Sequence, residues 1–478
     1  MQRSIEAWRA RVLEDTGKDP DGLARELVEG WHVHPLYVES DAARARPSQG
    51  GFQVACDVTP ATLAPGLEQA LRAGVELVWV EAGVGSDVIE LVRASGLPSL
   101  VVGGAGPGSV ADPLRGDGLE GLALPERGWA LLASGRQAHE AGAAAHEELA
   151  LALGVALDWL RVAERRGLDL ERAAGAVLVE LGLDADVALG IAKLRAARVV
   201  WAKLLRASGV RGELAMRVCG SRRGLSSLDP VLNVLRGAAA AFAGIVGGAR
   251  IVGVPPFDAL GGSSRLAERI ARNTPLLLRE EARLDAVLDP AAGSHYIEAL
   301  TDQVARATWQ ALAGLEARGG AIAAHRSLAY ETHAARRRDA MRRRTLKMVG
   351  VNRYPSPEPP AGAAEPDGAR DALEIEELRR RASALQITRR KVDVAVLGAA
   401  EKLGPRLEFV RELLAVGGLA ASSDKTGARA AVVCAADADY ASLGPDAVRS
   451  LRASGAAAVL FAGRPAAAES ALRAAGVT

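Results

Sequence analysis

The chain has 478 residues, which is enough for two or three domains with a large buried core. Its formal net charge is +1, so electrostatics give no argument for a nucleic acid or an anionic membrane as partner. Its three cysteines (Cys56, Cys219 and Cys434) lie far apart and predict neither a disulfide framework nor a CxxC metal site, as is typical of a reducing cytosol. The first residues lack an apolar signal region, and no apolar run reaches the ~20 residues of a membrane span. We therefore expect a soluble cytoplasmic protein.

Residues 1–45 are predicted to form an amino-terminal arm. A helix is expected near Ile5–Asp15, and a loop follows it. His32 and His34 alternate as in an extended segment and would in principle share a metal ion. Ordinary loop packing is the favoured interpretation of this pair, so no metal site is predicted.

From about residue 50 the sequence predicts parallel strands that alternate with helices. Short apolar runs are each followed by Gly, Pro or Asp and then by a helical stretch; they lie at Phe52–Val58, Glu76–Glu81, Ser99–Gly103, Ala215–Cys219 and Arg250–Val254. Strands that are apolar on both faces indicate a parallel sheet covered on both sides, and a (β/α)8 barrel is one closed form of this pattern. Long helices are expected between residues 139 and 207 and after Ser294, where apolar residues recur at spacings of three and four. The barrel and its helical extension are assigned to residues 46–354.

A second α/β domain is predicted after a linker. A Pro/Ala-rich stretch and a charged helix at Leu373–Ala384 make up residues 355–390. In residues 391–478 buried strands alternate with helices; the strands are Val392–Leu397, Ala430–Cys434, Ala457–Phe461 and a weaker one near Leu419–Ser422. This pattern is typical of a small flavodoxin-like unit. The expected fold class is therefore α/β, with a TIM-type (β/α)8 barrel followed by a linker and a small flavodoxin-like domain.

Several segments, taken in order, resemble the methylmalonyl-CoA mutase family. They are Phe257–Leu260, Arg269–Thr274, Glu280–Glu281, Asp289–Ser294, Tyr296–Thr301 and Val349–Pro355, and Ser221–Arg223, Asp229–Pro230 and Asn233–Arg236 add a likeness to the family's small (beta) subunit. The resemblance implies a barrel that binds acyl-CoA along its axis. In the family's active chain this barrel closes over adenosylcobalamin held by a carboxyl-terminal domain, and the cofactor supplies the radical chemistry.

The segment Ala133–Ala143 resembles the family's active-site segment, but its chemistry differs. The family has a Tyr-His pair where this chain has Arg136 and Gln137, and a further His and Gln where it has Arg217 and Cys219. Gln137 can donate a hydrogen bond but cannot act as an acid, and Arg136 places a permanent charge where the family has an aromatic ring. The resemblance therefore implies that no catalytic residue is retained.

The cobalamin site is also expected to be degenerate. The family ligates cobalt through the His of a D-x-H-x-x-G loop, whereas the matching loop here, Gly398–Pro405, has neither Asp nor His. Ala400 and Lys402 stand at the degenerate positions, and a lysine ammonium group, protonated at neutral pH, is a poor cobalt ligand. The last histidine of the sequence is His333, so this domain has no imidazole. We expect this chain to bind no cofactor and adenosylcobalamin to belong to a partner subunit.

The arm and a shortened region of the barrel both point to a partner. About thirty residues separate the strand that ends at Gly103 from Arg136, room for roughly one βα unit, and this is fewer than the family has there. Whether the barrel closes with eight strands, stays open or is completed by a partner is left undecided. The arm resembles the region with which family subunits clasp each other, and Trp31, Leu36 and Tyr37 are its expected anchors. Deleting residues 1–37 is expected to weaken assembly more than folding.

Three other features have a structural and a functional interpretation, and we favour the structural one in each. The Gly-rich stretch Gly103–Ser109 favours a plain turn over a phosphate-binding loop, because Pro107 removes a backbone donor. His139 and His146 favour a solvated helix face over a metal site. The basic stretches Arg336–Arg338 and Arg342–Arg344 favour an exposed helix or subunit contact over binding of CoA phosphates or RNA.

The sequence thus predicts the non-catalytic small subunit of an adenosylcobalamin-dependent methylmalonyl-CoA mutase. The isomerisation of methylmalonyl-CoA and succinyl-CoA would be carried by a large cobalamin-binding subunit, and the two would form a heterodimer. The alternative is a stand-alone acyl-CoA-binding protein or a divergent enzyme that uses the degenerate barrel pocket. The identity of the partner, the acyl-CoA bound and any regulatory role are left open.

Overall fold

The computed structural model describes residues 2–37, 51–58, 76–81, 84, 89–90, 92, 98–102, 109–355, 370–386, 390–423 and 428–478. The chain separates into two compact units. The barrel unit comprises residues 1–225, 233–340 and 368–370, and the carboxyl-terminal unit comprises residues 226–232, 341–367 and 371–478. Each unit is described by itself. The Gly-rich stretch before Ser109 and most of the Pro/Ala-rich linker lie outside the described residues.

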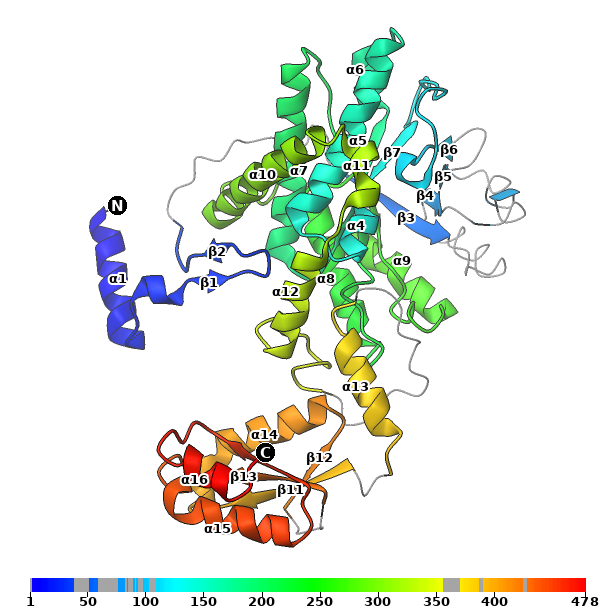
Figure 1. Ribbon diagram of the computed structural model, residues 1–478. Helices are drawn as coiled ribbons and strands as arrows, with labels where there is room; N and C mark the ends of the chain where they lie inside the picture. The colour runs from blue at the N-terminus through cyan, green and yellow to red at the C-terminus, as the bar shows by residue number, and fades with distance from the viewer. Residues whose placement is uncertain are drawn as a thin grey trace. The chain divides into compact units, whose positions relative to one another are not determined.

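Eight parallel strands in chain order form the barrel (Figure 1). They are β3 (Gln53–Val58), β4 (Leu77–Val80), β5 (Ser99–Val102), β6 (Ser109–Val110), β7 (Leu131–Ser134), β8 (Val177–Leu183), β9 (Ala215–Gly220) and β10 (Ile251–Gly253). Each strand of the sheet pairs in parallel with its neighbour in sequence, and β10 pairs with β3. The remaining gap is bridged where Ala111 pairs with Leu131, with Ala111 N donating to Ala130 O at 2.8 Å and Leu132 N donating to Ala111 O at 2.8 Å. The predicted TIM-type parallel barrel is confirmed, and the bridge from Ala111 to Leu131 joins its two ends within this chain.

The shortened region keeps its strand and lacks a helix. Residues 109–135 are all described, and between β6 and β7 they contain only a 3-10 turn, η2 (Pro113–Arg115). The alternative of an open barrel that a partner completes is therefore wrong. The sequence did not reveal β6 because two residues are too short to show an apolar period.

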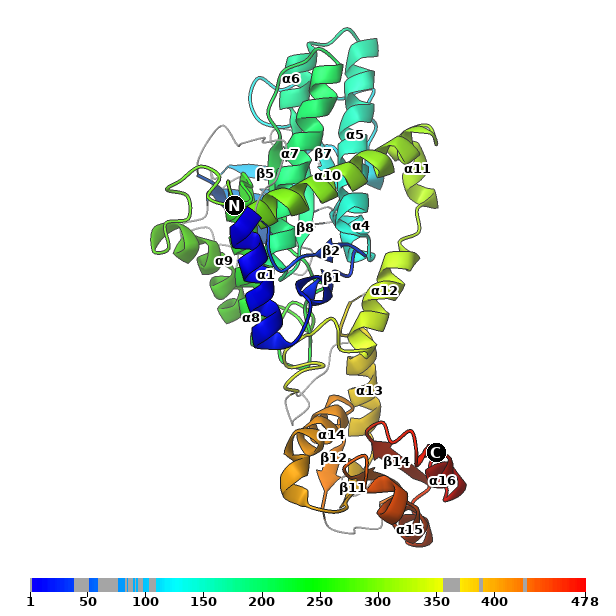
Figure 2. The same ribbon diagram turned by 90° about the vertical axis from the view of Figure 1, so that its left-hand side faces the viewer.

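Long helices cover the barrel on the side of β7 to β10. They include α5 (Ala145–Arg165), α7 (Val187–Ala207), α8 (Leu232–Val246), α9 (Arg265–Glu280) and α10 (His295–Glu316), with the short α4 (Arg136–Glu140), α6 (Leu170–Gly175), α11 (Ala321–Ala324), η3 (His325–Ser327) and α12 (Glu331–Arg342). Helix α10 lies across α5 and α7 (Figure 2). Side-chain caps fix where two of these helices begin, because Asp186 accepts from Leu189 N at 3.1 Å and Ser294 from Ile297 N at 3.5 Å.

The amino-terminal segment contributes to the core of this chain. It consists of α1 (Gln2–Thr16), η1 (Pro20–Leu23) and an antiparallel hairpin of β1 (Arg25–Glu26) and β2 (His32–Val33). Leu27 and Val33 are buried in the main core, and the ring of Trp31 lies 5.7 Å from that of His146. The ring of Tyr37 lies 5.5 Å from that of Tyr296. Two of the three residues expected to anchor a partner therefore pack on their own chain.

The carboxyl-terminal unit is a four-stranded parallel sheet in the order β12-β11-β13-β14. Its elements are α13 (Leu373–Ser383), β11 (Lys391–Val396), η5 (Ala400–Leu403), α14 (Gly404–Val416), β12 (Ala420–Ser422), β13 (Ala430–Cys434), α15 (Tyr440–Ala453), β14 (Ala458–Ala462) and α16 (Glu469–Ala474). Alternate residues of β13 face opposite sides: Val433 packs with α15 and α16, and Val432 packs with α14. The predicted small α/β domain is confirmed.

Candidate functional site

Inward-facing side chains of the barrel form two layers along the strands. Leu132 pairs in register with Leu178, and two residues further along Ser134 pairs with Glu180. Glu180 is in turn aligned with Arg217 on β9. Because side chains two residues apart point to the same face, the strands contribute an apolar layer first and a charged layer nearer their carboxyl ends. In most enzymes of this fold the chemistry lies at that carboxyl end.

Arg217 is at the centre of the charged layer. It is fully buried, and its guanidinium donates to Asp57 Oδ1 at 2.6 Å and to Glu180. The group also stacks over the ring of Trp79, with Cζ 3.9 Å from the ring centroid. A buried guanidinium is stable only when its charge and donors are matched in this way.

Arg136 extends the same network from the beginning of α4. Its Nη1 lies 3.0 Å from Glu81 Oε1 and 3.6 Å from Glu180 Oε1. Ser134 donates to the other oxygen of Glu180 at 2.7 Å. Two arginines and three carboxylates are thus linked by ion pairs, with one negative charge in excess. We call this group, with Ser134 and Cys219, the barrel network.

Cys219 joins the barrel network, whereas Gln137 lies outside it. The Cys219 thiol contacts Asp57 Oδ2 at 3.4 Å, and burial together with that carboxylate raises the pKa of the thiol to about 12. It is therefore a protonated, unreactive thiol at neutral pH. Gln137 is exposed, and its amide oxygen, when turned towards Arg115, accepts from Nε at 2.9 Å. Three of the four substituted positions are brought together and the fourth is not.

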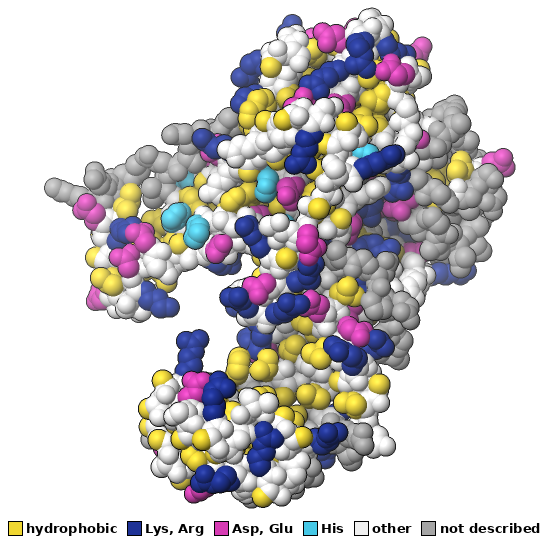
Figure 3. All heavy atoms as spheres, in the orientation of Figure 1, with side chains coloured by type: hydrophobic (Ala, Val, Ile, Leu, Met, Phe, Trp, Pro, Cys, Tyr) yellow, Lys and Arg dark blue, Asp and Glu magenta, His cyan; other side chains and the backbone are white. Residues whose placement is uncertain are grey.

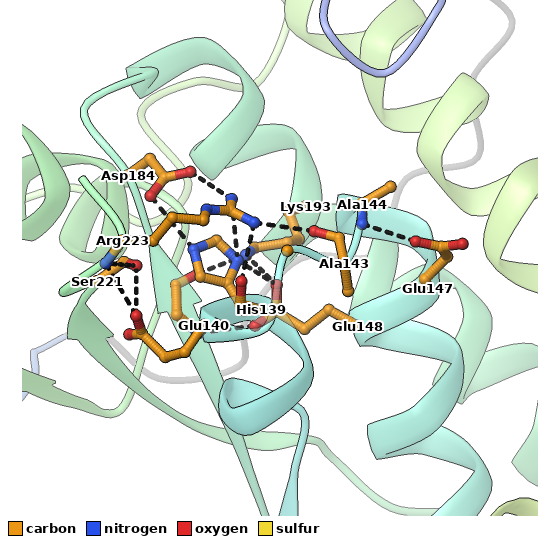
Figure 4. A network of polar contacts seen from close by, with 12 residues as sticks. His139, Glu140, Ala143, Ala144, Glu147, Glu148, Asp184, Lys193, Ser221 and Arg223 are labelled. Carbon is orange, nitrogen blue, oxygen red and sulfur yellow. Dashed lines mark hydrogen bonds and ion pairs between the residues drawn. The ribbon is translucent and has the colours of Figure 1, made fainter. Parts of the chain in front are cut away.

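A second network lies at the carboxyl end of β8 and centres on His139 (Figure 4). The imidazole Nδ1 is 3.0 Å from Glu148 Oε2 and Nε2 is 3.2 Å from Asp184 Oδ1. Glu148 also accepts from Lys193 Nζ at 2.5 Å, and Asp184 accepts from Arg223 Nη2 at 2.5 Å. Both ring nitrogens thus face carboxylate oxygens, and Arg223 Nη2 also lies 3.4 Å from Nδ1. We call these five residues the His139 network.

The electrostatics of the His139 network favour the charged form of its two carboxylates, Glu148 and Asp184. Burial acts to raise the pKa of Glu148, but the charges of Lys193 and His139 together outweigh it and hold that pKa below its usual value. Burial likewise acts to raise the pKa of Asp184, but the charges of Arg223, His139 and Arg337 hold that pKa well below its usual value. The expectation that His139 lies on a solvated helix face is wrong: only 3% of the residue is exposed. His139 and His146 also lie in different helices, α4 and α5.

Glu140 positions the loop that follows β9. Its carboxylate accepts from Ser221 Oγ at 3.2 Å and from the backbone N–H groups of Arg222 and Arg223 at 3.1 and 2.9 Å. The ring of His139 leaves room only for glycine at position 182 of β8, because an added Cβ would lie 2.6 Å from His139 Cδ2. The segment Ala133–Ala143 therefore packs against both β8 and the loop after β9.

The loop after β11 contains no histidine. Ala400 and Lys402 lie in η5, and no histidine follows His333 in the sequence. On the same edge of the sheet Arg406 lies 2.9 Å from Asp437 Oδ1, so a cation and a carboxylate there neutralise each other. The donor set does not fit a corrin whose cobalt needs an imidazole.

The sequence missed the acidic partners of the barrel network. Asp57, Glu81 and Glu180 each stand in or directly after an otherwise apolar strand. Such isolated carboxylates were a usable signal, because a buried charge needs a counterion. Their pairing with Arg136 and Arg217 became visible only when the closure of the barrel brought distant strands together.

The basic stretches around α12 are largely neutralised within the chain. Arg338 pairs with Glu331, Arg342 Nη2 lies 2.6 Å from Glu374, and Arg344 Nη2 lies 2.5 Å from Glu412. In the view of Figure 3 basic and acidic side chains are interspersed over the described surface. These contacts agree with a helix that uses its arginines structurally.

The described residues contain neither a cluster suited to a metal ion nor a helix suited to a membrane. No group of three or more His, Cys, Asp or Glu side chains there is arranged to hold a metal ion. None of the helices in the described part of the chain is long and apolar enough to cross a membrane.

Comparison with known proteins gives a consistent result. The family model for methylmalonyl-CoA mutase matches residues 128–421. A protein of Streptomyces virginiae named methylmalonyl-CoA mutase small subunit is 34% identical over 512 residues, which cover 94% of this chain and 82% of that protein. A protein of Mycobacterium tuberculosis strain H37Rv named probable methylmalonyl-CoA mutase small subunit is 37% identical over 372 residues, covering 71% of this chain and 60% of the relative. A protein of Escherichia coli K12 named methylmalonyl-CoA mutase is 30% identical over 295 residues, covering 59% of this chain and 40% of that protein. The match thus spans about 60% of the length of the mycobacterial relative.

Proposed function

The chain belongs to the methylmalonyl-CoA mutase family, and we propose that it is the non-catalytic small subunit of an adenosylcobalamin-dependent mutase. A large cobalamin-binding subunit would carry the isomerisation of methylmalonyl-CoA and succinyl-CoA. The likeness to relatives named small subunit supports the assignment within the family.

The barrel network is the observation that carries this proposal. Arg136, Arg217 and Cys219 replace the hydrogen-bonding residues of the family, and each is engaged by a carboxylate of its own chain. An acyl-CoA that entered along the axis would have to displace buried ion pairs, which leaves charges unpaired at a cost of several kcal/mol. No side chain of the network is placed to protonate a thioester oxygen, because arginine keeps its proton and the Cys219 pKa is about 12.

The absent cobalt ligand supports the second half of the proposal. Without an imidazole after His333 the carboxyl-terminal unit has no side chain to replace the family's histidine. The corrin would then belong to the partner. The expected complex is a heterodimer with one cobalamin.

Helix α1 remains the best candidate for a clasp on that partner. The hairpin β1–β2 belongs to the core of this chain, whereas α1 is joined to η1 through Arg9, which lies 2.6 Å from Asp21. Leu13 on α1 is 52% exposed. A contact of the arm with the large subunit is therefore assigned to residues 2–16 rather than to Trp31 and Tyr37.

The proposal is tested by assaying the purified chain with methylmalonyl-CoA and adenosylcobalamin, alone and with the large subunit. We expect no turnover by the isolated chain and full turnover by the complex. The double variant Arg136→Tyr, Gln137→His is expected to stay inactive alone, because the cofactor site is absent independently. Turnover by the isolated wild-type chain would contradict the proposal, and tight CoA binding by it would favour the stand-alone acyl-CoA-binding protein.

A further inference from the structure

The turn of the amino-terminal hairpin places a carboxyl group in the interior of the barrel unit. Glu29 lies between β1 and β2, in the turn where Leu27 N donates to Trp31 O at 2.7 Å. Only 9% of Glu29 is exposed, although glutamate is almost never buried without a partner. The hairpin lies beside α12 (Figures 1 and 2), and this helix supplies the group that faces the carboxyl, His333.

The imidazole of His333 turns an acceptor towards Glu29. The residue is 5% exposed, and its Nδ1 lies 2.9 Å from Gly142 O. A carbonyl oxygen can only accept, so Nδ1 carries the hydrogen of this contact, and Nε2 of the neutral ring is an acceptor without a hydrogen. Nε2 has no hydrogen-bond partner among the described residues and lies 3.7 Å from Glu29 Oε1.

A proton on one of the two groups is needed to make this contact favourable. An ionised carboxylate and a neutral imidazole would set two acceptors against each other in the interior. A bridging water is excluded, because two hydrogen bonds of about 2.8 Å hold their ends further apart than 3.7 Å. Burial lowers the pKa of His333 to about 4, and burial raises the pKa of Glu29. These directions place the proton on the carboxyl group.

The charges around the pair do not replace this proton. The titratable and charged groups that face the pair from neighbouring elements are Arg336 and Arg337 on α12, Arg223 after β9, Asp186 before α7 and His146 on α5. Arg223 and Arg337 act to lower the pKa of Glu29, but burial has the larger effect. Both arginines also contact Asp184, at 2.5 and 3.7 Å, so that carboxylate offsets their charge. Burial lowers the pKa of His146, which therefore adds no cation at neutral pH.

We propose that the contact of Glu29 with His333 is a proton-dependent latch on the amino-terminal hairpin. In its protonated form the Glu29 carboxyl donates to His333 Nε2 and holds β1 and β2 on the barrel unit, and ionisation of Glu29 loosens them. Because α1 precedes this hairpin, the latch bears on the whole amino-terminal arm. It is independent of the proposed function.

The two groups of the latch respond to pH with opposite signs. The pKa of Glu29 is raised in the fold above its ordinary 4.5, so its contribution is present at low pH and is lost as pH rises through the folded-state value. The pKa of His333 falls from 6.5 to about 4, so its contribution is present above pH 6.5 and is lost as pH falls towards 4. A variant that changes only Glu29 therefore isolates the first effect.

The proposal is tested by hydrogen exchange of the whole chain between pH 5 and 9, read by mass spectrometry in a peptide that spans residues 25–33 and corrected for the exchange of unprotected amides. Glu29→Gln keeps the shape of the side chain and offers an N–H to His333 at every pH. We expect similar protection of both proteins at pH 5. As pH rises the wild type should lose protection relative to the variant, by about tenfold for each pKa unit by which the fold raises Glu29.

A matched control comes from the same helix. The side chain of Glu331 is 73% exposed, and Glu331→Gln should leave the pH dependence of the hairpin as it is in the wild type. The same pH dependence in the wild type and Glu29→Gln would overturn the proposal. A hairpin that is looser in Glu29→Gln than in the wild type at pH 8 would do so too, because loss of an ionised partner gives that result.

A second measurement does not depend on how well a variant folds. In the wild-type chain labelled with 15N-histidine, the ring of His333 at pH 6 is expected to carry its hydrogen on Nδ1 and none on Nε2. An imidazolium, or a neutral ring with its hydrogen on Nε2, would contradict the latch. Neither measurement involves the large subunit or a mutase assay, so failure of the latch leaves the proposed function untouched.

Discussion

The two ends of the barrel differ in a way that reverses the usual arrangement of this fold. The carboxyl end, where enzymes with this fold hold their substrates, is filled by the barrel network and the His139 network. The amino end has a cavity of about 380 Å³ whose lining includes Phe52, Trp129 and Trp201. A chain that no longer needs an open active site can fill it with ion pairs that stabilise the fold. Under the proposed non-catalytic role, these ion pairs make the carboxyl end part of the core.

The largest effect is expected from removing the cation at the centre of the barrel network. Arg217→Met removes the cation that pairs with Asp57 and leaves Glu180 only the longer contact with Arg136, so it should lower the free energy of unfolding by about 3–5 kcal/mol. Urea unfolding followed by tryptophan fluorescence measures this, because all seven tryptophans lie in the barrel unit. Adding Asp57→Asn and Glu180→Gln should recover part of the loss. The exposed pair Arg161–Glu316 provides the control, and Arg161→Met should cost less than about 1 kcal/mol. Equal losses of stability for Arg217→Met and Arg161→Met would contradict the strong contribution expected of a buried ion pair.

The His139 network should make stability depend on acid. The pKa of Glu148 in the folded state is below its ordinary value of 4.5, so its contribution is present above that pH and is lost as pH falls through the lower, folded-state value. Glu148→Gln should destabilise the chain by a few kcal/mol at pH 7, because Lys193 and His139 lose a counterion. Unfolding curves between pH 3 and 7 should also show a shallower pH dependence in the variant. The same pH dependence in the wild-type chain and the variant would show that Glu148 does not cause the acid sensitivity.

A smaller loss of stability is expected where the His139 network leaves no room for a side chain. Gly182→Ala would place a methyl group 2.6 Å from His139 Cδ2 and should cost about 1–3 kcal/mol. Gly175→Ala is the matched control in α6, since an added Cβ meets nothing within 4 Å there. That substitution should stabilise the helix by roughly 0.5–1 kcal/mol. The two substitutions should therefore change the free energy of unfolding in opposite directions. Destabilisation by both would show that the loss at Gly182 is not specific to the contact with His139.

The smallest effect on folding is expected from removing α1. Deletion of residues 1–18 should change the stability of the barrel unit by less than about 1 kcal/mol, because exposed helices contribute little to a core. Deletion of residues 1–37 should cost several kcal/mol, since it also removes Leu27 and Val33 from the core. Binding to the large subunit, measured by pull-down, should be weakened by the shorter deletion already. Unimpaired binding after that deletion would move the interface away from α1.

The sequence predicted the architecture well and the site only in part. Apolar runs located five barrel strands and the small α/β domain, because strands buried on both faces are continuous apolar segments. It missed three strands: β6, which has only two residues, β7, and β8, which lies in a region that was assigned to long helices. It also placed His139 on a solvated face because the spacing to His146 suggested one helix. Arg136, Arg217 and Cys219 were singled out as substituted positions, but the carboxylates that they contact lie up to 162 residues away in the sequence. Periodicity reports local burial and carries no information about such distant pairing.

The central claim is that this chain supplies structure and a partner supplies the cofactor. The most direct test is to co-express the chain with the large mutase subunit encoded in the same genome, and to measure the cobalamin content of the complex after size-exclusion chromatography with adenosylcobalamin. The account predicts a 1:1 complex with one cobalamin per pair of chains and no cobalamin on the isolated chain. Two cobalamins per pair, or a stable monomer that ignores the large subunit, would contradict it.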